Sequence, residues 1–158
     1  MPQTAFLFSI AGLSVTLSGF SGLVAAFRRG GEWKGIDAYR LRQIPEMGLA
    51  TALLVLATIP LSETVRSASV AIQLAALVAV VFTFSHGVVL LIRARRQALK
   101  LTPGNFAFAL VIDVTILALG ATAIVVGSPT AFEWLLVSML ARPMLAFVLA
   151  LTELPKVP

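Results

Sequence analysis

The sequence contains no cysteine and only one histidine, and charged residues make up just 12% of its 158 positions. Without cysteine, the chain cannot form disulfides, iron–sulfur clusters or thiolate metal sites. It also lacks the His-Glu-x-x-His pattern of zinc hydrolases and a glycine-rich phosphate loop. These absences predict a protein that is not an enzyme and that holds no metal.

Haem is the one cofactor that a single histidine in a membrane segment could indicate. A membrane cytochrome would ordinarily hold its haem with two histidines from different helices. His86 is the single histidine of this chain, so it could supply such a pair only across a dimer. The ligand count therefore argues against haem, and we expect no cofactor.

The low charge content also argues against a soluble domain, in which about a quarter of the residues are charged. Here 59% of the residues are hydrophobic and the mean hydropathy is +0.99. Several apolar stretches are long enough to cross a hydrocarbon core of roughly 30 Å, where only helices and closed barrels satisfy the backbone. We therefore expect an all-α, polytopic integral membrane helix bundle that forms a single transmembrane domain over residues 1–158.

Five transmembrane helices are expected, and proline is expected in the first turn of the second and fourth, at Pro45 and Pro103. The connection at 127–130, Gly-Ser-Pro-Thr, has turn residues but no charge. Four helices followed by a re-entrant or interfacial C-terminal helix is therefore the alternative. Five is favoured because a run of about 20 apolar residues normally spans a bilayer. The expected spans are 4–27, 44–62, 69–92, 106–127 and 131–151.

Basic residues concentrate in two loops, 28–43 and 93–105, which hold nine of the twelve lysines and arginines. The basic-residue rule places both loops in the cytoplasm and the N-terminus outside, as in a bacterial cytoplasmic (inner) membrane. The net charge of +5 could suggest nucleic acid, but these cations flank helix ends, where orientation and anionic headgroups account for them. The expected partners are the lipid bilayer, with anionic lipid at the basic loops, and no nucleic acid.

The first apolar segment carries a strip of small residues at four-residue spacing: Ser14, Ser18, Gly22 and Ala26. Residues with this spacing share one helix face, and small side chains let two backbones approach closely. In lipid, helices associate through packing, so this helix-packing strip predicts a helix contact. The partner helix lies either in the same protomer or in a second copy, and the spacing alone does not distinguish them.

Three ionisable residues are expected at a similar depth inside the membrane. Arg142 and Pro143 stand side by side within the apolar run LLVSMLARPMLAF. Counting about 1.5 Å per residue from the cytoplasmic helix ends places His86, Asp113 and Arg142 roughly 9, 10 and 13 Å deep. Pro143 cannot donate to the carbonyl of Met139, which adds an acceptor at this level. We therefore predict an intramembrane polar layer built from three different spans.

Arg142 requires a partner, because an unpaired arginine at mid-membrane costs at least ~2.5 to 3.5 kcal/mol. The short connection makes the fourth and fifth spans antiparallel neighbours, and folding this hairpin brings Arg142 within about one helical turn of Asp113. Glu46 and Glu133 lie near opposite membrane boundaries and match Arg142 less well in depth. We therefore predict an ion pair between Asp113 and Arg142.

Two interpretations of this layer follow. In the first, the pair fixes helix register and His86 forms a hydrogen bond beside it. In the second, the three side chains line a pathway for a proton or small anion, because intramembrane ionisable residues often mark such routes and histidine titrates near neutral pH. We expect a small channel or transporter-like protein for ion transport, working as a homo-oligomer because five thin helices enclose little room. The alternative is a non-catalytic accessory or scaffold subunit docked on a membrane protein partner.

Overall fold

Five long helices make up the part of the protein that the structure describes. The structure, a computed structural model, describes residues 2–27, 35–65, 67–96 and 103–152. Within these ranges every regular element is an α-helix, and each of the five contains an apolar segment long enough to cross a membrane. The expected all-α architecture with five spans is confirmed, and the fifth helix is continuous over 24 residues. The helices are α1 (Thr4–Phe27), α2 (Gly35–Val65), α3 (Ala68–Arg96), α4 (Pro103–Val126) and α5 (Pro129–Thr152).

The second helix starts earlier than the sequence predicts. α2 begins at Gly35, well before the expected start at 44, so Pro45 lies inside the helix and its predicted place in the first turn is wrong. Extending an existing helix costs little once the helix is nucleated, which lets α2 continue beyond its apolar part. An interior proline is tolerated in membrane helices because neighbouring groups satisfy the carbonyl that it frees. Pro103, by contrast, begins α4 as expected.

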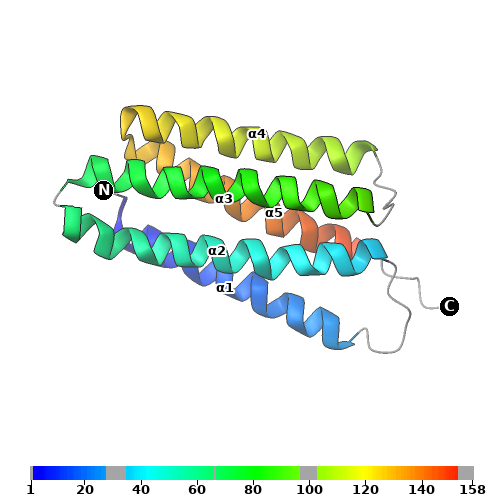
Figure 1. Ribbon diagram of the computed structural model, residues 1–158. Helices are drawn as coiled ribbons and strands as arrows, with labels where there is room; N and C mark the ends of the chain where they lie inside the picture. The colour runs from blue at the N-terminus through cyan, green and yellow to red at the C-terminus, as the bar shows by residue number, and fades with distance from the viewer. Residues whose placement is uncertain (1, 28–34, 66, 97–102, 153–158) are drawn as a thin grey trace.

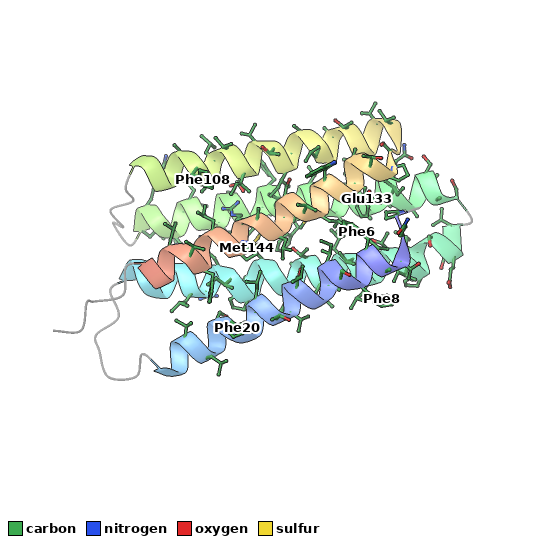
Figure 2. All side chains as sticks on the ribbon, turned by 180° about the vertical axis from the view of Figure 1, so that it is seen from behind. Phe6, Phe8, Phe20, Phe108, Glu133 and Met144 are labelled. Atoms are coloured by element: carbon green, nitrogen blue, oxygen red, sulfur yellow. The ribbon has the colours of Figure 1, made fainter. Side chains whose placement is uncertain are left out.

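The helices form two antiparallel pairs with α5 packed between them. Figure 1 shows α3 and α4 on one side, α1 and α2 on the other, and α5 running behind. α5 contacts all four other helices. Figure 2, seen from behind, shows α5 crossing obliquely from the α4 side at its start to the α2 side at its end. α5 is therefore the central helix of the bundle.

The two ends of the bundle differ in charge. α1 and α3 end, and α2 and α4 begin, at the same end of the molecule (Figure 1). We call this the basic end, because Arg42, Arg93, Arg95 and Arg96 lie there. The opposite end, where α2 meets α3 and α4 meets α5, is the turn end. Side chains of Arg28, Arg29, Lys34, Arg40 and Lys100, which belong to the predicted basic loops, lie outside the described residues.

Two apolar clusters fill the interior at different levels. The larger one lies toward the turn end and contains residues such as Val55, Ile72 and Phe132, from three different helices. The smaller one lies toward the basic end and is formed by Leu41, Ile44 and Ala146. The outer surface is apolar as well: Figure 2 shows exposed Phe8, Phe20 and Phe108 around the bundle. The interior level between the two clusters holds the polar groups described below.

A tight turn sets the register of α4 and α5. Gly127 has a φ of 65°, a left-handed conformation that suits glycine, and its N–H donates to the Ala123 carbonyl at 2.9 Å. The Ser128 hydroxyl accepts from the N–H of Ala131 at 3.3 Å, and Pro129 starts α5. These residues hold the two helices antiparallel, and the short turn limits how far one helix can slide along the other.

The first half of the predicted helix-packing strip contacts α2 in the same protomer. A Cβ on Gly48 of α2 would lie 2.8 Å from the Ser14 carbonyl oxygen and would collide with the Ser18 hydroxyl. Gly48 therefore permits the close approach of α1 and α2. Gly22 is exposed, with nothing within 4 Å of a Cβ built on it, and the side chain of Ala26 lies outside the described residues.

Candidate functional site

Arg142 and Asp113 form an ion pair between α5 and α4. The Nη1 atom of Arg142 contacts Oδ1 of Asp113, and the two side chains are 9% and 23% exposed. The predicted contact is therefore present. It arises because the short turn before α5 fixes the register of the hairpin, so that a long arginine side chain covers the remaining offset. Pairing lowers the cost of holding each charge away from water.

His86 lies near this pair, but it does not make the hydrogen bond considered from the sequence. Its imidazole stacks on the ring of Phe82, one turn away on α3, with ring centroids 5.6 Å apart and an interplanar angle of 21°. Its Nε2 atom is buried and has no hydrogen-bond partner among the described residues. The hydrogen bond of the first interpretation is therefore absent at this atom, and the ring contacts Phe82 on its own helix instead. Arg142, Glu46 and Arg93 are all close enough to act electrostatically on the imidazole.

Glu46 links α2 to α3 at the basic end. Its Oε1 atom lies 2.6 Å from Nε of Arg42, one turn earlier on α2, and 3.9 Å from Nη1 of Arg93 on α3. The sequence predicts that Glu46 lies near the membrane boundary but does not indicate its partner. The four-residue spacing from Arg42 could have indicated the first contact. The second depends on how α2 and α3 pack, which the sequence does not show.

Thr83 adds a polar group that the sequence analysis did not single out. It lies one turn from His86 on the same face of α3, is 2% exposed, and its Oγ1 has no hydrogen-bond partner among the described residues. Thr51 and Thr58 differ, because their hydroxyls each donate at 2.8 Å to the carbonyl one turn earlier. A buried hydroxyl that makes no hydrogen bond can donate one to a neighbouring group or accept one from it. The sequence does not show that Thr83 is buried in this way.

Charges of both signs surround His86. Arg142 and Arg93 are positive, and Glu46, which Arg42 also contacts, is negative. In the part of the chain that the structure describes, no three His, Cys, Asp or Glu side chains gather to hold a metal ion.

Fold and site together define the class: in its described residues, a membrane protein of five helices with ion pairs between two apolar clusters. Comparison of the chain with protein families, with curated proteins and with solved structures found no match. Fold alone does not determine function, so the geometry and chemistry of the site must indicate it.

Proposed function

We propose that this protein is a small channel or transporter-like membrane protein, working as a homo-oligomer, in which the polar layer handles a proton or small ion. The ion pair between buried Arg142 and partly buried Asp113, with His86 close enough to Arg142 to interact with its charge, is the observation that carries the proposal. Ionisable groups inside a membrane are costly, and they often mark the route of an ion or proton.

Charged side chains connect the layer to one end of the bundle. On α3, Arg93 is 39% exposed at the basic end, His86 lies two turns further in, and Thr83 lies one turn beyond that. The smaller apolar cluster lies at the same end, and the larger one fills the interior toward the turn end. A polar site that charged side chains link to one end of the bundle suits a gated or alternating-access protein. The basic-residue rule makes the basic end the cytoplasmic one.

Flux measurements on the full chain in liposomes test this proposal. Wild-type protein should pass protons or small ions at a rate that depends on pH, because a histidine can gain or lose a proton. His86→Ala should remove the pH response, whereas Ser85→Ala, at the exposed neighbouring position, should keep it. Electrically silent liposomes, or an unchanged pH response in His86→Ala, would contradict the proposal.

The accessory-subunit alternative is supported by one observation on α1. Gly12 and Gly19 lie on its exposed surface with nothing within 4 Å of a Cβ built on either, so another backbone could approach closely there. An accessory subunit would purify as a monomer or dimer without flux. Imaging in nanodiscs separates the two functions, because a channel assembly should show a symmetric ring with a central pore.

A further inference from the structure

A groove opens between α2 and α3 in the half of the bundle near the turn end. Its volume is about 300 Å³. The rim is formed by exposed side chains, Leu53 and Ala57 on α2 and Val78 on α3, whereas Ala79 and Met139 on the floor are buried. The rim side chains are exposed where the surrounding medium is hydrocarbon, so the groove is open to the lipid.

The lining of the groove is suited to a hydrocarbon ligand. Alanines at 50, 57, 75 and 79 create the space, because their side chains do not reach across between the helices. The one hydroxyl among the lining residues, that of Thr58, donates to the Leu54 carbonyl at 2.8 Å, so its hydrogen-bonding need is met within α2. A polar ligand group would find no partner on this surface, whereas methylene groups would pack against it.

The dimensions of the groove fit a single acyl chain. From Ala50 to Leu61 the groove follows α2 for about 16 Å at 1.5 Å per residue. One leaflet contributes about half of the roughly 30 Å hydrocarbon core, so the length of the groove matches one leaflet. A helix from a second copy is about 10 to 12 Å across with its side chains, far too wide for this volume. The contact would also be too small for a stable dimer, which buries about 800 Å² on each partner.

We propose that this groove binds one acyl chain of a lipid from the leaflet at the turn end. The chain end meets Phe82, which lines the groove and stacks on His86. An occupied groove therefore restrains the Phe82 ring and, through it, the imidazole. Binding of the acyl chain does not depend on the proposed transport function. A lipid bound in the groove would contact Phe82 and, through Phe82, affect the polar layer.

Photo-crosslinking of the full chain in nanodiscs tests this inference. The probe is phosphatidylcholine with a diazirine in the middle of one acyl chain, and labelled residues are identified by mass spectrometry. Label should concentrate at Ala57 and Val78, above the level at Val111 and Val114 on α4, which are about as exposed as Val78. Equal labelling of the two surfaces would overturn the inference.

Two variants at neighbouring positions sharpen the experiment. Ala57→Phe places a ring in the groove and should reduce labelling of Val78 to the level seen on α4. Leu56→Phe, at an exposed position outside the groove, should leave it unchanged. Matching circular dichroism and gel-filtration profiles establish that both variants fold. Undiminished labelling in Ala57→Phe would refute specific binding.

A second copy is the competing occupant, and the absence of cysteine allows a direct test. Leu53→Cys should give no disulfide-linked dimer in nanodiscs if lipid fills the groove. Efficient dimer formation through this position, together with an unlabelled groove, would show that protein covers it and would overturn the lipid assignment.

Discussion

Removing either member of the Asp113–Arg142 pair should destabilise the protein unequally. Asp113→Asn leaves Arg142 charged and 9% exposed. Breaking a buried pair by removing one partner costs about 3 to 5 kcal/mol. Asp113 is itself 23% exposed, so the loss for Asp113→Asn should be smaller than for a fully buried pair. We expect the free energy of unfolding to fall by about 2 to 4 kcal/mol. Arg142→Gln should cost less, since the remaining carboxyl is more exposed and can take up a proton to become neutral.

The double variant gives the decisive measurement. Asp113→Asn combined with Arg142→Gln removes both charges and leaves two groups that can hydrogen-bond, so it should be more stable than Asp113→Asn alone by about 1 to 2 kcal/mol. The assay is reversible unfolding of the purified chain by SDS in mixed micelles, followed by circular dichroism. Arg95→Gln, at an exposed position on α3, is the control and should change the free energy of unfolding by less than about 0.5 kcal/mol.

Additive effects of the two substitutions would refute the reasoning. If the double variant loses the sum of the single losses, the two side chains do not share an interaction in the folded protein. If both single variants are as stable as the wild type, the ion pair does not contribute to the free energy of unfolding. Neither a role in fixing helix register nor a role in a pathway would then have a physical basis.

Three further substitutions test packing, turn geometry and surface pairing in the same unfolding assay. Gly48→Ala should cost about 1 to 3 kcal/mol because its Cβ collides with α1, whereas Gly19→Ala, which meets nothing, should be neutral or slightly stabilising. Gly127→Ala should cost about 1 to 2 kcal/mol because of its left-handed backbone, and more if Ser69 cannot move away. Glu46→Gln should cost less than about 1 kcal/mol, with a smaller effect at high salt, because its ion pairs are solvent-exposed. A loss at Glu46 as large as that at Asp113 would contradict the dependence on burial.

Much of the helical architecture was predictable because the bilayer imposes a simple length rule. Apolar runs of about 20 residues must be helical, so the five spans could be counted from hydropathy. The start of α2 at Gly35 could not be predicted in this way, because the residues before 41 lie outside the apolar run. Hydropathy identifies only the part of a helix that lies in the hydrocarbon core. Local helix extension there follows backbone cooperativity, which leaves no apolar pattern.

The candidate site was partly predictable for a related reason. The short connection makes α4 and α5 antiparallel neighbours, so counting depth along this hairpin was enough to pair Asp113 with Arg142. The contact between Glu46 and Arg93 depends on the rotation of α2 and α3 about their axes, which no short turn determines. The stacking of His86 on Phe82 depends on the side-chain rotamer of His86. The sequence allows both a hydrogen bond to the ion pair and a contact with the Phe82 ring, and it does not predict which of them forms.

The central position of α5 has a consequence for biogenesis. α5 contacts all four other helices, yet it follows them along the chain and is made after them. During synthesis α4 therefore reaches the bilayer with its carboxylate still lacking the guanidinium that will later neutralise it. Insertion of the fifth helix delivers that guanidinium and the packing surface for the other four at the same moment. A nascent chain arrested before α5 emerges should accordingly be held at the insertion machinery or degraded, while one arrested after it should be released into the membrane.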